Sequence, residues 1–309
     1  METPLPHPPD PRLALLQDLG WRSVETGDAP RLARWLKRQP RCAPQVLQSR
    51  LSLLFESRLQ DAMEMGQDAA SLGFWVLEDQ REEPLAILLA RGAVEVFAPD
   101  MAAWPQVLGF LDCALPEVPA LFGETPFVAY ALSTLRQLPG RVTRDEPMQV
   151  LTLGRDGGRS GAIDPAFRPA QPGELAEVFD RGAAMREEEH GLPAGSMRTD
   201  GTLEHLANLL LKERVWVLEV DGQVVYQVEM GHQTTDWVSL EGAWTVPACR
   251  GRGFGHRGWQ AACRAALERA PGVTAWTRET HFAQLRVMAE AGMQLCEPGW
   301  RLICWEPRS

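Results

Sequence analysis

The stretch from Trp244 to Gly255 constrains the fold of this chain more than any other. It reads WTVPACRGRGFG: an apolar run over 237–246 enters a turn marked by Pro247, a glycine-rich loop follows, and an amphipathic helix then begins. Successive N–H groups of such a loop point into one concavity, and the amino terminus of the helix adds partial positive charge. The glycines let an anion approach the main chain without a Cβ in the way. The pattern predicts a pyrophosphate-binding turn between a strand and a helix.

The sequence argues against two common nucleotide-binding loops. A P-loop needs Gly-Lys-Ser/Thr at its end, and no such triplet follows here. A dinucleotide-binding fold needs GxGxxG and an acidic residue at the end of the next strand; GFGHRG at 253–258 has the glycine spacing, but the strand expected at 273–277 contains no acidic residue. A strand–helix turn that binds nothing is the remaining alternative, because short motifs often match by chance.

A chain of 309 residues is long enough for about two domains. The glycine-rich, charged segment GRDGGRSG at 154–161 is the strongest linker signal. We therefore expect a proline-rich tail at 1–12, one domain at 13–153 and a second at 162–309. In both halves, helices precede a run of strands, which predicts an α/β (α+β) layered fold.

The hydrophobic periodicity predicts elements in each half. The first half shows helical patterns around Leu32–Leu36 and 46–55, strands at 74–77, 85–90, 94–97 and 120–122, helices at 101–112 and 126–137, and a closing strand at 148–153. The second half shows helices at 173–186, 202–213, 255–269 and 281–291, a loop at 187–201, strands at 167–170, 215–220, 224–230, 237–246 and 273–277, a hairpin turn at Asp221-Gly222, and a hairpin over 293–305 turning at Pro298-Gly299.

The distribution of charge along the chain indicates which partners the protein can bind. The net charge is -10, but residues 161–250 hold 15 acids and 7 bases, whereas residues 251–309 hold 5 acids and 8 bases. The overall sign argues against nucleic acid and against an anionic membrane surface, and no apolar run approaches the ~20 residues of a transmembrane helix. The 6 cysteines form no CxxC pair, so we expect no metal site and a reducing, cytoplasmic location.

Residues 162–309 resemble the GNAT acyltransferase superfamily. The matching positions are Arg250, Gly253 and Gly255 of the R/Q-x-x-G-x-G/A signature, Val246-x-Ala248 before it, and Gly292-Met293 where the family has N-x-x-A-x-x-L-Y-x-x-x-G-F. The segment MREEEHG at 185–191 resembles a GNAT subgroup whose first half looks like a degenerate GNAT domain without the phosphate loop. The resemblance implies two tandem GNAT-like domains, each a mixed, mostly antiparallel twisted sheet flanked by helices.

The resemblance also implies acetyl-CoA as the acyl donor. Its pantetheine arm is expected between two splayed strands, 237–246 and 273–277, and its pyrophosphate on the glycine loop. The residues that this implies for cofactor binding are Trp244, Thr245, Val246, Arg250, Gly251, Arg252, Gly253, Phe254, Gly255 and His256, together with His281 at the family's pantetheine-binding Asn position.

Acyl transfer to an amine needs a base for the ammonium proton and an acid for the leaving thiolate. Glu241, on the strand before the glycine loop, is the candidate base; an exposed strand residue is the alternative. The family's usual acid, a Tyr, is replaced by Met288, and neither Tyr130 nor Tyr226 matches that position. His281 is the candidate acid, unless it merely begins a helix after a Thr280 N-cap.

The acidic run Glu187, Glu188 and Glu189 stands where the family frames its acceptor. It favours a cationic acceptor, although a solvated helix end would look the same. We therefore expect an acetyl-CoA-dependent N-acetyltransferase acting on a primary amine of a small molecule, amino acid or peptide, with a homodimer as one possible assembly. An acyl-CoA-binding sensor without catalysis and a tandem aminoacyl transferase are the alternatives. The acidic balance argues against the latter, which would bind tRNA.

Overall fold

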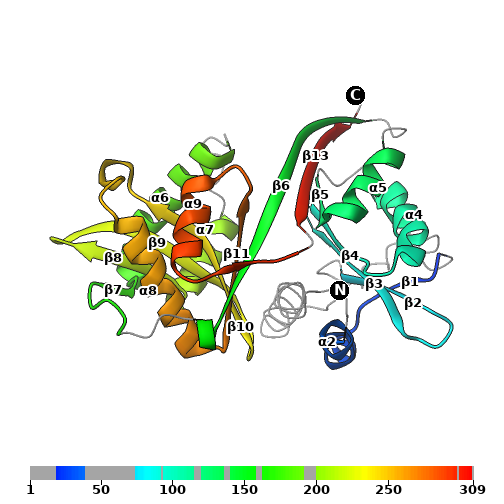
Figure 1. The fold of residues 1–309 in the computed structure, drawn as a ribbon, viewed down its shortest axis with the longest axis horizontal. Helices are drawn as coiled ribbons and strands as arrows, with labels where there is room; N and C mark the ends of the chain where they lie inside the picture. Colours follow the sequence, from blue (N-terminus) through cyan, green and yellow to red (C-terminus); the bar gives the residue numbers. More distant parts are fainter. Residues whose placement is uncertain are drawn as a thin grey trace, which may run out of the picture. The chain divides into compact units, whose positions relative to one another are not determined.

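The computed structural model describes residues 19–38, 74–91, 93–114, 120–135, 140–157, 162–190, 200–297 and 299–307. These residues divide into two compact units, and Figure 1 labels their elements. Unit 1 takes the residues up to Met148 and those from Glu297 onward, and unit 2 spans Gln149–Cys296. The expected tail at 1–12 and the helical pattern at 46–55 lie outside the described residues.

Unit 1 is a sheet packed with helices. Its strands follow the order β1-β2-β3-β4-β5-β13-β6, in which β4 and β5 are parallel and all other neighbours are antiparallel. Trp21, Phe110, Leu121 and Ile303 belong to one buried cluster, so residues from both ends of the chain share this core. The elements are β1 (Trp21–Ser23), α2 (Ala29–Lys37), β2 (Phe74–Glu78), β3 (Pro84–Arg91), β4 (Ala93–Phe97), α4 (Trp104–Ala114), β5 (Ala120–Glu124), α5 (Thr125–Leu135), β6 (Gly140–Gly154) and β13 (Trp300–Pro307).

Unit 2 is built on the strand order β6-β11-β10-β9-β8-β7, to which β6 contributes its last residues. The pairs β7–β8, β8–β9 and β9–β10 are antiparallel, and β10–β11 is parallel. Asp221 and Gly222 take φ values of 53° and 73° in the β8–β9 turn, as a tight hairpin requires. The elements are β7 (Phe167–Pro169), α6 (Leu175–His190), α7 (Asp200–Leu211), β8 (Val215–Val220), β9 (Gln223–Gln233), β10 (Trp237–Thr245), α8 (Phe254–Arg269), β11 (Gly272–Arg278), α9 (Phe282–Glu290) and β12 (Gln294–Leu295).

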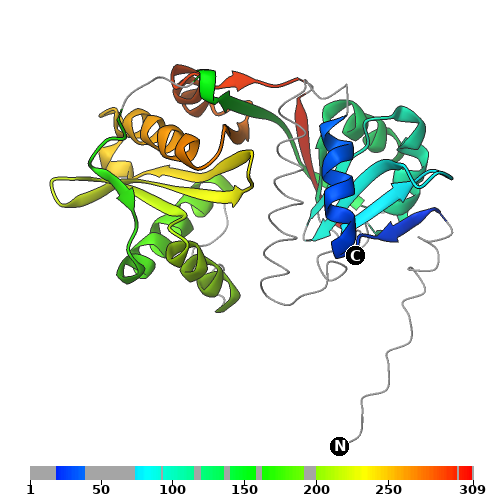
Figure 2. The same ribbon diagram turned by 90° about the horizontal axis from the view of Figure 1, so that it is seen from below.

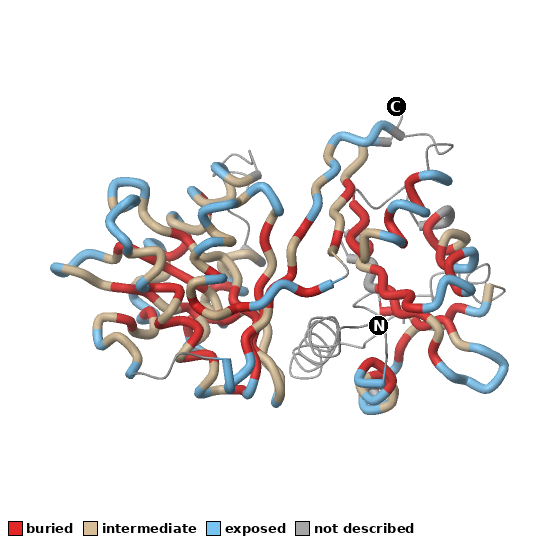
Figure 3. Tube along the Cα trace, in the orientation of Figure 1, coloured by how far each residue is buried: buried red, intermediate tan, exposed pale blue. Residues whose placement is uncertain are grey.

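Helices cover both faces of the sheet in unit 2. Figure 2 shows α8 in orange on one face of the strands and α6 and α7 in green on the other. The expected apolar stripe of α8 is buried at Trp259, Ala262, Cys263 and Ala266. Figure 3 shows the buried segments in the middle strands and the exposed ones at the loops and outer helix faces. The predicted fold class, a mixed and mostly antiparallel sheet flanked by helices, is confirmed.

Three predicted elements differ in the structure. The helix expected at 173–186 continues to His190, so 187–190 is helical and not a loop. The strand expected at 148–153 begins at Gly140, because β13 pairs with its first half. The hairpin expected over 293–305 is wrong: β12 pairs with Leu151 and Thr152 of β6, whereas β13 pairs with β5 and β6.

The boundaries between the two units do not coincide with the predicted linker. The divisions fall after Met148 and after Cys296, while the proposed boundary at 154–161 follows β6. The boundary in the sequence stays a prediction. Within the described residues, no helix is both long enough and apolar enough to span a bilayer.

Candidate functional site

The two central strands of unit 2 diverge. The parallel ladder between β10 and β11 joins Trp237–Ser239 to Gly272–Thr274 and includes no later residue of β10. A β-bulge between Glu241 and Trp244 shifts the register of β10 against β9, with Gly242 at φ 58°. A bulge bends and twists its strand, so β10 turns away from β11 over the residues that precede the glycine loop.

The glycine loop has the conformation that its sequence predicts. After β10, Pro247–Cys249 form a short 3-10 turn, and Gly253 is the N-cap of α8. Gly251 and Gly253 take φ values of 74° and 81°, which residues with a Cβ rarely adopt. The first N–H groups of a helix have no acceptor within the helix, so the start of α8 offers donors to an anion.

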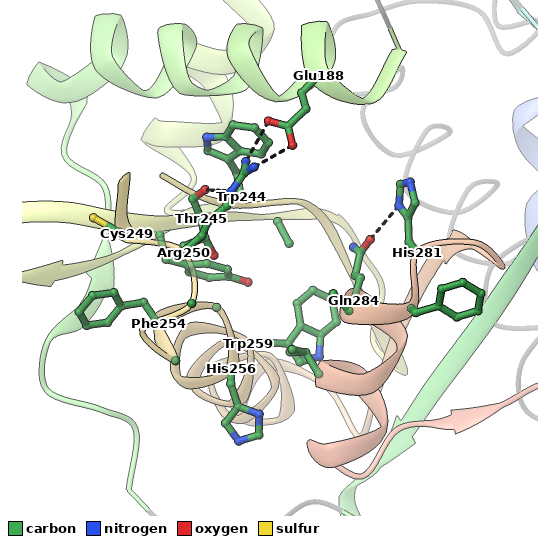
Figure 4. A pocket seen from close by; sticks show the side chains of 18 of the residues that line it. Glu188, Trp244, Thr245, Cys249, Arg250, Phe254, His256, Trp259, His281 and Gln284 are labelled. Atoms are coloured by element: carbon green, nitrogen blue, oxygen red, sulfur yellow. Dashed lines mark hydrogen bonds and ion pairs between the residues drawn. The ribbon is translucent and has the colours of Figure 1, made fainter. Parts of the chain in front are cut away.

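A cavity of about 750 Å³ opens between the diverging strands, the glycine loop, the end of α6 and the start of α9. Figure 4 shows the side chains that surround it. Its lining residues are Glu188, Glu189, Tyr226, Ala243, Trp244, Thr245, Cys249, Arg250, Gly251, Gly253, Phe254, Gly255, His256, Trp259, Arg278, Thr280, His281, Phe282, Ala283, Gln284 and Val287. All of them belong to unit 2.

Arg250 joins two parts of the site that the sequence treats separately. Its guanidinium binds both carboxylate oxygens of Glu188 at 2.8 and 3.0 Å, as Figure 4 shows. Its Nε donates to the carbonyl of Thr245 at 3.1 Å, and its Cζ lies 4.4 Å from the centroid of the Trp244 ring. These contacts hold the end of α6 against the glycine loop. Arg278 adds a second contact to α6, because its Nη2 donates a hydrogen bond to the carbonyl of Glu189 at 2.7 Å.

Two buried donors line the cavity without a hydrogen-bond partner among the described residues. They are the hydroxyl of Tyr226 and the indole N–H of Trp259, and each residue is only 2% exposed. Burial raises the pKa of Tyr226 well above its ordinary value, so the hydroxyl keeps its proton. An unsatisfied buried donor is costly, and a ligand with amide carbonyls, such as a pantetheine arm, would satisfy both groups. The donor set therefore fits acetyl-CoA, with the glycine loop for the pyrophosphate and this pair for the arm.

His281 lies at the other end of the cavity and is itself the N-cap of α9, in place of the Thr280 considered above. Its Nδ1 lies 3.4 Å from Oε1 of Gln284, which also accepts a hydrogen bond from Thr277. Since that oxygen only accepts, Nδ1 carries the proton and Nε2 is free for another partner. Met288 is 1% exposed, so the position of the family's acid is filled by a core side chain.

Glu241 is partly buried beside Ser239, whose hydroxyl donates to its Oε1 at 2.6 Å. Nε2 of His232 lies 4.0 Å from the same oxygen. Glu229, its cross-strand partner on β9, is a residue that the sequence analysis missed. Withdrawal from water, followed by the charge of Glu241, raises the pKa of Glu229 to about 7, against a smaller opposite effect of Arg186.

The cavity gathers most of the residues expected for the cofactor and part of the acceptor set. Glu187, Glu241, Val246 and Arg252 are not in its lining. The N–H of Val246 donates to the carbonyl of Val225 at 3.0 Å, and Arg252 lies over the Phe254 ring with its Cζ at 4.9 Å. The cavity lining also includes Tyr226, Trp259 and Gln284, which the sequence analysis did not predict as site residues. The alternation of β9 and the periodicity of α8 and α9 give the face on which each side chain lies, but not the cavity that these faces line.

Residues 184–293 match the family model described as acetyltransferase (GNAT) family. These residues form a GNAT domain. The match covers the end of α6, the glycine loop and α9, and thus the whole cavity lining. No curated protein matches the chain in sequence.

Solved structures extend the likeness to most of the chain. A Drosophila protein of 14% identity gives a TM-score of 0.62, covering 94% of this chain and 99% of its own. A GCN5-related N-acetyltransferase from Sphaerobacter thermophilus gives 0.59 at 16% identity, covering 93% of this chain and 95% of its own. A tandem GNAT protein from the clavulanic acid biosynthesis pathway gives 0.52 at 10% identity, covering 94% and 98% respectively. At these identities the likeness shows the fold, and the expected tandem GNAT fold is confirmed.

Proposed function

We propose that this protein is an acetyl-CoA-dependent N-acetyltransferase that acts on a primary amine of a small molecule, amino acid or peptide. The observation that carries the proposal is one cavity that joins three features: a glycine loop at the start of α8, a gap between β10 and β11, and two unsatisfied donors, Tyr226 and Trp259. A long ligand with an anionic head and an amide-bearing arm matches these features in that order.

The residues of the chain have separate tasks in this reaction. Acetyl-CoA supplies an activated acetyl thioester when bound. N–H groups of the glycine loop bind its pyrophosphate, and Tyr226 and Trp259 donate hydrogen bonds in the gap. Glu241 takes the proton of the arriving ammonium group, and Ser239 holds its carboxylate in place. His281 with both ring nitrogens protonated delivers a proton to the leaving sulfur from Nε2, while Gln284 accepts from its Nδ1.

The acceptor side of the cavity carries negative charge from α6. Glu188 is neutralised by Arg250, so Glu189 is the acid that a cationic amine meets first. Withdrawal from water raises the pKa of Glu189, while the charge of His281 opposes the shift. Glu187 lies on the same turn outside the cavity lining and contributes only long-range attraction.

Acetyl-CoA binding by the full-length protein tests the proposal. Gly253→Glu places an anion at the start of α8 and a side chain at a φ of 81°, so calorimetry should show a loss of about 100-fold or more in affinity, ~2.8 kcal/mol. Gly173→Glu is the control, because an added Cβ there meets nothing within 4 Å and Gly173 is outside the cavity lining. Thermal unfolding of both variants separates a binding defect from misfolding.

Turnover is measured as release of CoA thiol with a panel of small primary amines, amino acids and short peptides. Absence of acetyl-CoA binding by the unsubstituted protein contradicts the proposal at its first step. Binding without acetylation of any amine in the panel favours the sensor alternative.

A further inference from the structure

The first residue of α9 is a large apolar side chain that solvent reaches. Phe282 is 76% exposed, the highest value among the large apolar side chains that the described residues leave on the surface. Within those residues it is also the only such side chain that lines the cavity. Because removing apolar surface from water is favourable, an exposed ring in a cavity lining is suited to bind an apolar part of a ligand.

Neither core packing nor helix formation accounts for a phenylalanine at this position. Helix α9 packs against the core of unit 2 through Leu285, Val287 and Met288, whereas Phe282 is not part of that core. Phenylalanine is also a weak helix former, and the first turn of a helix favours acidic residues. The described contacts thus give the ring no structural task, while it lines the cavity.

The rest of α9 continues the apolar surface of the cavity. Ala283 and Val287 line it from the same helix, together with the polar side chains of His281 and Gln284. Figure 4 marks the contact between Nδ1 of His281 and Gln284, which leaves Nε2 for another partner. A ligand that lies along α9 would therefore contact carbon atoms next to the proposed proton donor.

An acid lies close to this apolar surface. Nη2 of Arg278 donates to the carbonyl of Glu189 at 2.7 Å, and the N–H of His281 donates to the carbonyl of Arg278 at 3.0 Å. Arg278 thus connects the end of α6 to the residue that precedes Phe282. Withdrawal from water raises the pKa of Glu189, and the charge of His281 opposes this shift, so the two side chains are near each other. Glu189 is partly buried and Phe282 is exposed, so the ring is nearer the opening than the acid.

The nucleobase of the cofactor is the competing partner for an aromatic ring at this place. It is attached next to the diphosphate, which the proposed function assigns to the glycine loop. Figure 4 shows His281 on the opposite side of the cavity from Arg250 and Phe254 of that loop. Glu189 also repels an anionic nucleotide and attracts an ammonium group. The start of α9 therefore fits the acceptor better than the nucleotide.

We propose that Phe282 is a specificity-determining residue for the acceptor and selects primary amines that carry an apolar chain or an aromatic ring. The amine enters nitrogen first, its ammonium group passes Glu189, and its substituent lies against Phe282 at the opening. This inference rests on the proposed function and narrows its acceptor to an amphipathic amine. An amino acid is disfavoured, because its carboxylate would lie near Glu189.

A series of acceptors of increasing length tests the proposal. Release of CoA thiol gives kcat/KM at saturating acetyl-CoA for ethylamine, butylamine, hexylamine and 2-phenylethylamine. In the unsubstituted protein kcat/KM should rise about 2- to 4-fold for each methylene group added, as expected for burial of apolar surface. A value that stays constant or falls along the series overturns the proposal.

Phe282→Ala should remove most of this dependence on length. We expect kcat/KM to fall about tenfold for hexylamine and 2-phenylethylamine and to change less than about twofold for ethylamine, because only the longer substituents reach the ring. Phe282→Leu should restore part of the loss. An unchanged dependence on length in Phe282→Ala overturns the proposal.

Leu211→Ala is the matched control for Phe282→Ala. Leu211 is 73% exposed at the end of α7, belongs to the same unit and lies outside the cavity lining. Its removal should leave kcat/KM for all four amines unchanged. Both side chains are exposed, so thermal unfolding should show that both variants fold.

The affinity for acetyl-CoA shows which ligand contacts the ring. Calorimetry with Phe282→Ala should give the affinity of the unsubstituted protein within about twofold. A loss of about tenfold or more, with an unchanged dependence on amine length, would assign Phe282 to the cofactor and overturn the proposal.

Glu189→Gln tests the charged part of the same orientation. We expect kcat/KM to fall about fivefold for all four amines alike, because the acid attracts the ammonium group and does not contact the substituent. Glu187→Gln, on the same helix turn outside the cavity lining, is the control. Unchanged kinetics in Glu189→Gln, or a loss confined to the longer amines, contradicts the proposed orientation.

The outcomes separate this inference from the proposed function. If polar amines or amino acids are acetylated and the series is not, the acceptor class is wrong and the acetyltransferase function stands. If no amine is acetylated, the proposed function fails. Saturation-transfer NMR of 2-phenylethylamine with the full-length protein and CoA then still decides about Phe282: the ring signals should be weaker in Phe282→Ala, and equal signals overturn the inference.

Discussion

Tyr226 combines burial, a retained proton and an unsatisfied hydroxyl in the lining of the cavity. In Tyr226→Phe, the ring still packs against α8 at Gly258, but the donor is removed. We expect acetyl-CoA affinity to fall about 2- to 13-fold, the effect of one hydrogen bond of ~0.5–1.5 kcal/mol. Since the free protein gains nothing from an unpaired hydroxyl, Tm should stay the same or rise. Calorimetry and thermal unfolding measure the two effects.

Tyr130 provides the matched control. It is the other tyrosine of the chain, is exposed on α5 and packs its ring against Trp104. Tyr130→Phe removes the same atom outside unit 2 and should leave acetyl-CoA affinity unchanged. Equal affinity in Tyr226→Phe and the unsubstituted protein would show that the hydroxyl makes no bond to the cofactor.

Single residues were predictable where backbone chemistry dictates them. Gly251 and Gly253 have positive φ, and the sequence marks both through the spacing of a loop before a helix. No sequence pattern identifies Glu229 or Tyr226. Alternation along a strand predicts the face on which a side chain lies, but not its neighbour on the next strand. The significance of Glu229 depends on the register that places Glu241 opposite it, and register is a long-range property.

Among the elements, α6 changes the interpretation of the acidic run. The sequence predicted that Glu187, Glu188 and Glu189 lie in a loop, but glutamates and arginines favour helix, and no glycine lies between Gly182 and Gly191. Two contacts with the rest of unit 2 also hold the last turn: Glu188 with Arg250, and the Glu189 carbonyl with Arg278. The strands β8 to β11 and helix α8 were predicted within one or two residues at most ends, because their periodicity is local.

The contact between α6 and the glycine loop should lower the affinity for a polyanion. Arg250 is also held by the Thr245 carbonyl and the Trp244 ring, so Glu188→Gln should leave it in place while removing a negative charge. We expect acetyl-CoA affinity to rise about 2- to 5-fold, because half-exposed pairs contribute only ~0.2–1 kcal/mol, and to become more sensitive to salt. Calorimetry at two salt concentrations measures both.

Glu187→Gln removes the same charge from the same helix turn outside the cavity and serves as the control. A lower affinity in Glu188→Gln would indicate the reverse role, in which Glu188 orients Arg250 for the pyrophosphate.

At the scale of the whole chain, the pairing of the last strand, β13, decides which part of the chain can be removed without unfolding a unit. Turn chemistry at Pro298-Gly299 predicted a local hairpin, but β13 instead lies between β5 and β6 in unit 1. Ile303 is fully buried in the core formed with residues such as Trp21 and Leu121. Local sequence signals could not reveal this, since the partners are more than 150 residues away and the competing hairpin was plausible on its own terms.

A chain that ends after Cys296 should therefore lose the fold of unit 1 and keep that of unit 2. It lacks the strand between β5 and β6 and the buried side chains of Trp300 and Ile303, each of which costs ~2–5 kcal/mol when a large core side chain is cut to alanine. Together with the lost strand pairing, this is comparable with the whole stability of a domain, ~5–15 kcal/mol.

Thermal unfolding and calorimetry measure the outcome. The truncated chain should lose the near-ultraviolet signal of unit 1 while still binding acetyl-CoA, because every residue that lines the cavity precedes Cys296. Trp300→Phe in the full-length chain is the control: it keeps the ring packing against Phe122 and should lower Tm slightly without loss of the unit. If the truncated chain unfolds in the same way as the full one, β13 does not stabilise unit 1. If it folds but no longer binds acetyl-CoA, the site depends on unit 1 as well.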